Sequence, residues 1–100
     1  NAVRKCYDEG KYVAAICAAP SVILGGMGLL KGRKATCYPG MESGMTGATP
    51  LERTCVVDGR IITACGVGGA LDFGCALVSA LCGEEKARRI AAEVVHNVRR

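Results

Sequence analysis

The sequence contains no tryptophan, one phenylalanine and three tyrosines, so large aromatic side chains cannot dominate its core. Half of the residues are hydrophobic and 14 are glycine, which leaves valine, isoleucine, leucine and alanine to fill an interior. Small aliphatic packing of this kind suits parallel strands covered by helices. With 100 residues, the chain has room for one domain or for part of one.

Metal-binding spacings are also missing. His96 is the only histidine, and the seven cysteines include no C-x-x-C pair, so no zinc-site pattern is present. We therefore expect no metal and no cofactor. The odd number of cysteines and their placement within apolar segments disfavour a disulfide framework. We expect a cytoplasmic protein in which six cysteines pack as small hydrophobic residues, with Cys37, Cys65 and Cys75 among them.

Long apolar runs and a strongly one-sided surface charge are absent as well. The most apolar stretch, residues 13–30, is interrupted by Pro20 and three glycines, which argues against a membrane span. Much of the net charge of +4 comes from arginines near the C-terminus, without the basic stripe and interleaved aromatics of a nucleic-acid-binding surface. The sequence therefore predicts neither a membrane nor a nucleic-acid partner.

The order of apolar runs, glycines and prolines predicts alternating strands and helices. Residues 2–9 resemble the end of a helix that stops at Gly10, an unusual opening that suggests the C-terminal portion of a longer protein. A first strand, a helix and a second strand would form a right-handed parallel crossover unit. The predicted elements are a strand buried on both faces at 12–17, a helix from 20 to about 30, a strand at 34–38, a surface loop at 41–50, hairpin strands at 53–57 and 60–64 around Asp58-Gly59, and helices at 70–81 and 84–97.

The segment Ala15-Ile16-Cys17-Ala18-Ala19 carries the strongest functional signal. It has the small-x-nucleophile-x-small spacing of a nucleophile elbow, in which a strand turns sharply into a helix. Unpaired N–H groups at the start of that helix would favour a Cys17 thiolate, and the Ala18 N–H would stabilise an oxyanion. The alternative is that Cys17 is a small buried residue at a strand end.

Other segments carry weaker signals. The glycines of residues 66–69 allow either a phosphate-binding loop or a tight strand-to-helix turn, and the turn is favoured because the full G-x-G-x-x-G pattern is missing. Glu42 and Ser43 are candidates for the rim of a pocket. His96 is expected at the solvent edge of the last helix.

Taken together, these segments resemble the ThiJ/PfpI superfamily, in the branch of the Parkinson's-disease protein DJ-one and bacterial YajL-type proteins. The resemblance implies a flavodoxin-like α/β fold of nearly twice this length that forms a homodimer. Residues 1–100 would then be the C-terminal half of a single domain. The matching segments are residues 13–20, 29–36, 38–40, 57–59, 61–63 and 66–68, and the helix around 72–77.

The resemblance also implies a site. Cys17 matches the family's reactive cysteine, whose partner is a glutamate in the N-terminal half. Three departures stand out: Ala18 replaces the histidine of the peptidase branch, Tyr38 replaces a histidine found in some relatives, and Cys65 replaces a frequent arginine. The first departure argues against a peptidase, and the last puts any anion contact at that position in doubt.

Three classes of function follow. The first is a cofactor-free enzyme of the glyoxalase or deglycase type, in which the Cys17 thiolate attacks small reactive carbonyl compounds. The second is a sensor of oxidative stress or a chaperone that uses oxidation of Cys17. The third, disfavoured by Ala18, is a cysteine peptidase.

Overall fold

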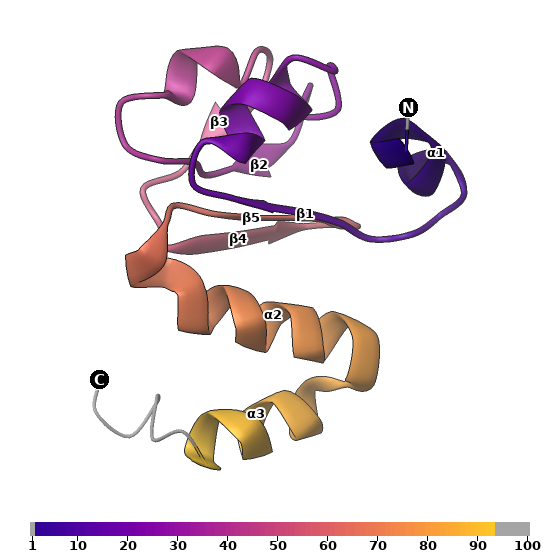
Figure 1. Cartoon of the computed structure of the whole chain (residues 1–100), viewed down its shortest axis with the longest axis vertical. Coiled ribbons are helices and arrows are strands. Elements are labelled where there is room, and N and C mark those ends of the chain that lie inside the picture. The colour runs from indigo at the N-terminus through magenta and orange to yellow at the C-terminus, as the bar shows by residue number, and fades with distance from the viewer. Residues whose placement is uncertain (1, 94–100) are drawn as a thin grey trace.

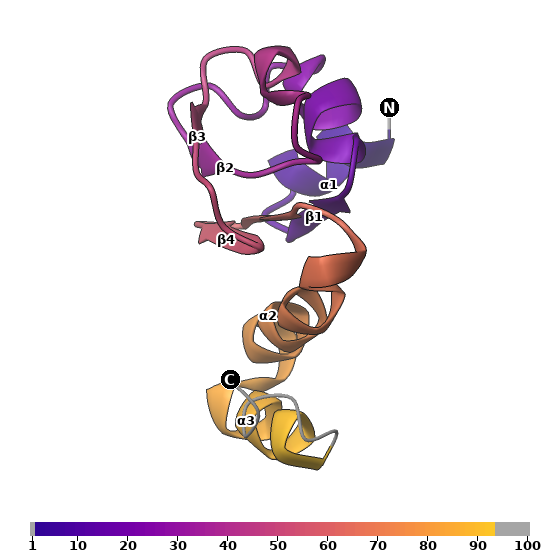
Figure 2. The same cartoon turned by 90° about the vertical axis from the view of Figure 1, so that its left-hand side faces the viewer.

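The computed structural model describes residues 2–93, which are arranged in layers around a small central sheet. Two short strands and several short helical turns cover one face of the sheet, and helices α2 and α3 lie beyond the other face (Figures 1 and 2). The apolar core lies between the sheet and the first of these layers, and it includes Val13, Ala15, Leu30 and Ile61. Among the described residues, no helix is long and apolar enough to cross a membrane.

The central sheet has the strand order β1-β5-β4, with β1 at Val13–Ile16, β4 at Cys55–Asp58 and β5 at Ile61–Ala64. Strands β1 and β5 are parallel and pair Val13 with Ile61 and Ile16 with Ala64. Within this sheet, β1 is an edge strand, and its residue Ala14 is exposed. The prediction of a first strand buried on both faces was therefore wrong for this chain, because only the face that carries Val13 and Ala15 is covered.

The predicted hairpin is confirmed, and its turn lies one residue further along the chain. Strands β4 and β5 are antiparallel, and Asp58 pairs with Ile61, so Gly59 and Arg60 form the two-residue loop. Gly59 has φ of +61° while Arg60 does not have a positive φ, as a type II′ turn requires. Asp58 belongs to the strand through its pairing with Ile61, and its carboxylate accepts a hydrogen bond from the Lys34 N–H at 2.7 Å.

The helix expected from Pro20 to about Leu30 is shorter and wider than predicted. It is a single π-helical segment, η1 at Pro20–Gly25, followed by turns. Pro20 occupies the first turn as expected, since proline has no N–H to leave unpaired there. At the other end, a side chain on Gly25 would meet the Gly44 carbonyl oxygen at 2.0 Å, so close packing against η2 (Glu42–Gly44) requires glycine.

The predicted crossover unit is not formed. The strand expected at 34–38 consists of two residues, β2 at Lys34–Ala35, and it pairs in parallel with β3 at Thr49–Pro50 in a separate two-stranded sheet. Strand β1 pairs with β5 instead, from Val13 with Ile61 to Ile16 with Ala64. The segment predicted as a surface loop therefore contains η2 and β3, and its Met45 is buried.

Two α-helices complete the chain after a short helical turn, η3 at Val67–Gly69. Helix α2 at Ala70–Cys82 packs on β4 and β5, and helix α3 at Glu84–Glu93 packs on α2. We predicted that the first of these helices would be largely buried, but it has no fully buried residue and its Leu71 and Leu81 are exposed. The prediction for 94–97, including His96, lies outside the described residues.

Candidate functional site

Cys17 stands at the carboxyl end of β1 and has an unusual backbone conformation. Its φ is +62°, and no other residue except glycine has a positive φ in the described range 2–93. Its N–H donates to the Ala64 carbonyl oxygen at 3.0 Å, and its own carbonyl oxygen accepts from the Tyr38 N–H at 2.8 Å. Hydrogen bonds on both sides thus hold Cys17 in a conformation that L-residues ordinarily avoid, as in a nucleophile elbow.

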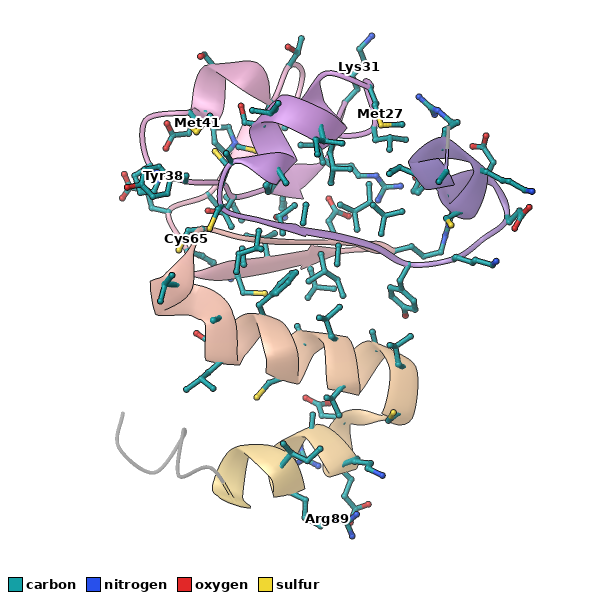
Figure 3. The ribbon with its side chains drawn as sticks, in the orientation of Figure 1. Met27, Lys31, Tyr38, Met41, Cys65 and Arg89 are labelled. Atoms are coloured by element: carbon teal, nitrogen blue, oxygen red, sulfur yellow. The ribbon has the colours of Figure 1, made fainter. Side chains whose placement is uncertain are left out.

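The surroundings of the Cys17 side chain leave it half-buried. A Cβ atom built on Gly66 would lie 3.7 Å from Cys17 Sγ and 3.8 Å from the ring of Tyr38. Tyr38 is 55% exposed, and Figure 3 shows it at the same end of the central sheet as Cys65. This end is the carboxyl end of the parallel strands, where open α/β sheets bind their ligands.

The chain after Cys17 turns at once into η1. The Ala18 carbonyl oxygen accepts from the Ser21 N–H at 3.1 Å and from the Val22 N–H at 2.9 Å. The Ala18 N–H, by contrast, makes none of the hydrogen bonds found between residues 2 and 93. A free N–H next to a nucleophile is the type of donor that stabilises an oxyanion.

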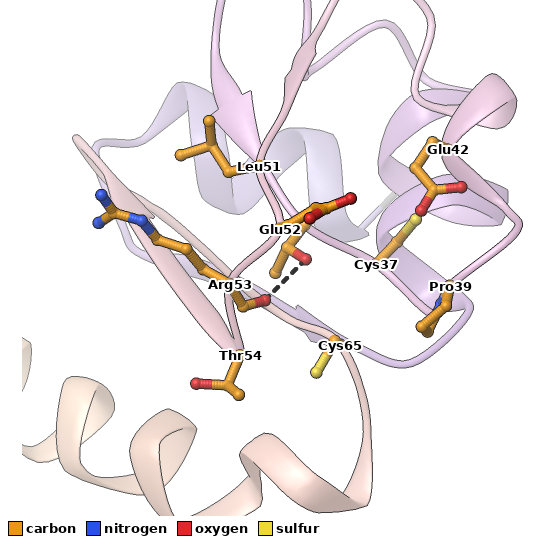
Figure 4. Close-up of a pocket in the computed structure, with 9 residues that line it drawn as sticks. Cys37, Pro39, Glu42, Leu51, Glu52, Arg53, Thr54 and Cys65 are labelled. Atoms are coloured by element: carbon orange, nitrogen blue, oxygen red, sulfur yellow. Dashed lines mark hydrogen bonds between the residues drawn. The ribbon is translucent and has the colours of Figure 1, made fainter.

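A pocket of about 370 Å³ lies near this end of the sheet (Figure 4). Glu42 lies on its rim as suggested by the sequence, while Ser43 does not line it. The Glu42 carboxylate accepts a hydrogen bond from the Gly40 N–H at 3.0 Å. The lining residues are Thr36, Cys37, Pro39, Glu42, Leu51, Glu52, Arg53, Thr54 and Cys65.

The other cysteines differ from one another in burial and acidity. Cys37 is buried as predicted, and burial together with the Glu42 carboxylate raises the pKa of its thiol. Burial, Asp72 and Cys65 raise the pKa of the Cys55 thiol in the same way. Cys37 and Cys55 are thus weakened as nucleophiles near neutral pH.

The expectation that the six cysteines other than Cys17 pack as hydrophobic residues is wrong for Cys82, which is exposed.

The structure joins some of the predicted site residues and leaves others apart. Cys17, Ala18, Tyr38 and Gly66 meet at one end of the sheet. Residues 66–69 form a tight turn into α2, as favoured from the sequence, because a side chain on Gly69 would meet the Thr54 carbonyl oxygen at 2.5 Å. Sequence reasoning assigned Cys65 to packing and missed its place in the pocket wall. The sequence placed Cys65 directly after a predicted hairpin strand, but only the pairing of β5 with β1 brings the end of that strand next to Cys17.

Two curated proteins illustrate the similarity of this chain to known sequences. Protein DJ-1 homolog B of Arabidopsis thaliana is 43% identical over 94 residues, which cover 93% of this chain and 22% of that protein. Deglycase PfpI of Pyrococcus furiosus is 41% identical over 63 residues, which cover 61% of this chain and 37% of that protein. The chain therefore spans less than half the length of either relative.

Solved structures give the same result for the fold. Oxidized DJ-1 of Toxoplasma gondii superposes with a TM-score of 0.86 at 34% identity, over 94% of this chain and 51% of that one. The α/β fold predicted from the sequence is thus the fold of the DJ-1 and ThiJ proteins, of which this chain spans about half. A sequence profile of the DJ-1/PfpI family matches residues 1–80, and the chain belongs to that family.

Proposed function

We propose that Cys17 is the nucleophile of a cofactor-free enzyme that acts on small reactive carbonyl compounds. The observation that carries this proposal is the conformation of Cys17, which is held at φ of +62° at the carboxyl end of a strand with its sulfur half-buried. Backbone strain of this kind is characteristic of functional positions. The similarity to a protein named as a deglycase supports the same class of chemistry.

The proposed reaction begins when the Cys17 thiolate adds to the aldehyde carbon of an α-oxoaldehyde such as methylglyoxal. The new C–S bond turns the carbonyl oxygen into an oxyanion, which the Ala18 N–H would stabilise, and protonation gives a hemithioacetal. A base then moves a proton from the first carbon to the second, giving a thioester. Attack by water releases lactate and restores the Cys17 thiol. Repair of glycated proteins would use related chemistry.

The base in this scheme is a glutamate of the N-terminal half, as the family resemblance implies. Within residues 2–93, no carboxylate is hydrogen-bonded to Cys17. We therefore propose that the N-terminal half of the same protein completes the site. From the family resemblance we also propose that the protein acts as a homodimer, and from its cysteine usage that it works in the cytoplasm. Replacing the candidate glutamate in the complete protein by glutamine would abolish turnover while leaving Cys17 open to alkylation.

Selective alkylation tests the role of Cys17 directly. The complete protein is treated with limiting iodoacetamide at about pH 6.5, well below the ordinary thiol pKa of about 8.5, and its peptides are mapped. Label should appear on the peptide that contains Cys17. Equally fast labelling of Cys6 or Cys37 would contradict the proposal.

Turnover of methylglyoxal separates this function from the principal alternative. Cys17→Ala should abolish lactate formation, while Cys65→Ala should retain most of it. Activity that survives Cys17→Ala would exclude the proposed mechanism.

The alternative is a non-enzymatic sensor of oxidative stress or a chaperone that responds to oxidation of Cys17. This role is supported by the similarity to DJ-1 of Toxoplasma gondii, whose solved structure is named as oxidized. A complete protein that turns over no carbonyl compound, yet holds client proteins in solution only after peroxide treatment, would support it. A peptidase remains disfavoured because Ala18 replaces the histidine that such an enzyme requires, and peptide hydrolysis lost in Cys17→Ser would reverse that judgement.

A further inference from the structure

Cys17 and Cys65 occupy equivalent positions at the ends of two paired strands. Strands β1 and β5 are parallel, and their last paired residues are Ile16 and Ala64. The next residue on each strand is a cysteine, and the ladder reaches that point because the Cys17 N–H donates to the Ala64 carbonyl oxygen at 3.0 Å. Adjacent strands lie about 4.8 Å apart. This spacing falls within the roughly 4.4–6.8 Å between α-carbons that a disulfide requires.

The contact between Cys17 and the residue after Cys65 supports this proximity. A Cβ atom on Gly66 would lie in van der Waals contact with Cys17 Sγ, at 3.7 Å. The Cys17 sulfur therefore lies against the backbone that leads directly from Cys65. Both thiols are free and only half-buried, and Cys65 is one of the residues that line the pocket of Figure 4. An open space on one side of Cys65 gives its side chain room to change rotamer.

We propose that Cys65 is the resolving thiol for oxidised Cys17, an inference that rests on the proposed reactivity of Cys17. Hydrogen peroxide transfers one oxygen atom to the Cys17 thiolate, which gives a sulfenic acid and hydroxide. The Cys65 sulfur then attacks the Cys17 sulfur, the S–O bond breaks, and water leaves with the Cys65 proton. The product is a Cys17–Cys65 disulfide, and a dithiol can reduce it by exchange.

The remaining cysteines are less suitable for this step. Cys37 lines the same pocket, but its buried position and the nearby Glu42 raise the pKa of its thiol. Attack on a sulfenic acid requires the thiolate form, so this shift slows Cys37. Cys55 lies on the neighbouring strand β4, and burial, Asp72 and Cys65 raise the pKa of its thiol, which slows it in the same way.

A disulfide between Cys17 and Cys65 would change the outcome of oxidation. An unprotected sulfenic acid reacts with more peroxide to give a sulfinic acid, which ordinary thiols do not reduce. Capture by Cys65 would divert Cys17 to a reversible product. The pair would therefore make inactivation by peroxide reversible. It would also raise the peroxide concentration at which Cys17 is converted irreversibly to a sulfinic acid.

Peptide mapping of the complete protein tests this proposal. The protein is treated with stoichiometric hydrogen peroxide, blocked with N-ethylmaleimide and digested without reduction by trypsin and an Asp-directed protease. Cleavage then isolates Cys17 in residues 12–31, Cys65 in residues 61–71 and Cys37 in residues 35–53. We expect residues 12–31 to be linked to residues 61–71, with a mass lower by two hydrogens than the sum. The link should disappear after treatment with dithiothreitol.

Variants provide the controls. Cys65→Ser should lose the link and accumulate sulfinate on residues 12–31 at a peroxide dose that leaves wild-type Cys17 reducible, and Cys65→Ala provides a second form of the test. Cys75→Ser, which changes a half-buried cysteine on α2, should retain the link.

A link that joins residues 12–31 to residues 35–53, or direct passage to sulfinate in the wild type, would overturn the proposal. If Cys17 resists both iodoacetamide and peroxide, the proposed function fails together with the inference. If it is alkylated and turns over methylglyoxal without forming the link, the inference alone fails.

Discussion

Cys17 combines a reactive side chain with a backbone conformation that ordinarily belongs to glycine. A positive φ costs an L-residue about 1–2 kcal/mol, because Cβ approaches the following carbonyl oxygen. Hydrogen bonds to Ala64 and from Tyr38 maintain this conformation. The position is thus better suited to presenting a thiol than to stabilising the fold.

Two substitutions at this residue separate strain from chemistry. Cys17→Gly and Cys17→Ala both remove the thiol, but only glycine adopts φ of +62° without a Cβ penalty. We expect the glycine variant of the complete protein to be more stable than the alanine variant by about 1 kcal/mol. Urea unfolding measures this difference. An alanine variant of equal or greater stability would show that the elbow stores no strain.

The thiols of Cys37 and Cys55 make stability depend on pH in the alkaline range. Their pKa values are raised in the folded protein by burial and by nearby carboxylates. Above the ordinary thiol pKa of about 8.5, the unfolded chain loses these protons while the native state keeps them. The free energy of unfolding should therefore fall as the pH rises from about 8.5 through the raised pKa values.

Replacing these cysteines tests the assignment. Cys37→Ala and Cys55→Ala should each reduce the alkaline loss of stability, measured as urea midpoints of the complete protein between neutral and alkaline pH. Cys82→Ala is the matched control, because this cysteine is exposed and its removal should leave the pH dependence unchanged. An identical alkaline loss in the wild type and in all three variants would contradict the prediction.

At the scale of elements, helix α1 (Ala2–Asp8) contacts the rest of the structure chiefly through Tyr7, which lies between two arginines, with Val3 packed against the core and Arg4 donating to the Met27 carbonyl oxygen at 2.8 Å. The helix has no fully buried residue. Its Tyr7 ring lies under the guanidinium groups of Arg60, at 4.4 Å, and Arg33, at 5.6 Å. Arg60 also donates to the Tyr7 carbonyl oxygen at 2.7 Å and to the Lys11 carbonyl oxygen at 2.9 Å, while Arg33 donates to the Tyr7 hydroxyl.

Removal of Arg60 should therefore loosen α1 without unfolding the sheet. We expect Arg60→Ala to lower the free energy of unfolding by about 1–3 kcal/mol, because charge-assisted hydrogen bonds and a cation–π contact are lost. Faster hydrogen exchange confined to α1 would be the local sign of this loss. Lys5→Ala, an exposed substitution on the same helix, is the control and should have little effect. Unchanged exchange in Arg60→Ala would show that other contacts hold the helix.

At the scale of the whole molecule, much apolar surface remains open. Strand β1 pairs on one side only in this sheet, and an unpaired edge favours association. A pocket of about 250 Å³ between α1 and β1 adds to this surface. Among the residues that the structure describes, the exposed large hydrophobic ones are Tyr12, Val22, Ile23, Tyr38, Val57, Val67, Leu71 and Leu81.

A polypeptide of residues 1–100 expressed alone should consequently self-associate or unfold at low denaturant concentration. Co-expression with the N-terminal half of the complete protein should restore a soluble complex, because its chain would cover these surfaces. Sedimentation velocity and urea unfolding measure both effects. A monomeric polypeptide with a cooperative unfolding transition would contradict the prediction.

Sequence patterns were most informative where local geometry decides structure. The spacing of small residues around Cys17 indicated an elbow, and the structure places that residue alone among non-glycine residues 2–93 at positive φ. Asp58-Gly59 indicated the hairpin to within one residue. Patterns were least informative for burial, since Ala14 and Leu71 are as apolar as core residues and are nevertheless exposed.

By itself, the sequence determined the alternation of strands and helices, the hairpin and the position of Cys17, because these depend on periodicity, turn residues and short-range sterics, while the flavodoxin-like fold followed from the family resemblance. Only the tertiary structure decided that β1 pairs with β5, that β2 joins β3 in a second sheet, and that Cys65 stands beside Cys17. The pairing of β1 with β5 joins residues 48 positions apart and that of β2 with β3 joins residues 15 apart, and both depend on which partners offer the best-matched hydrogen bonds and apolar faces. Local patterns do not encode that competition, because every candidate strand presents the same backbone groups.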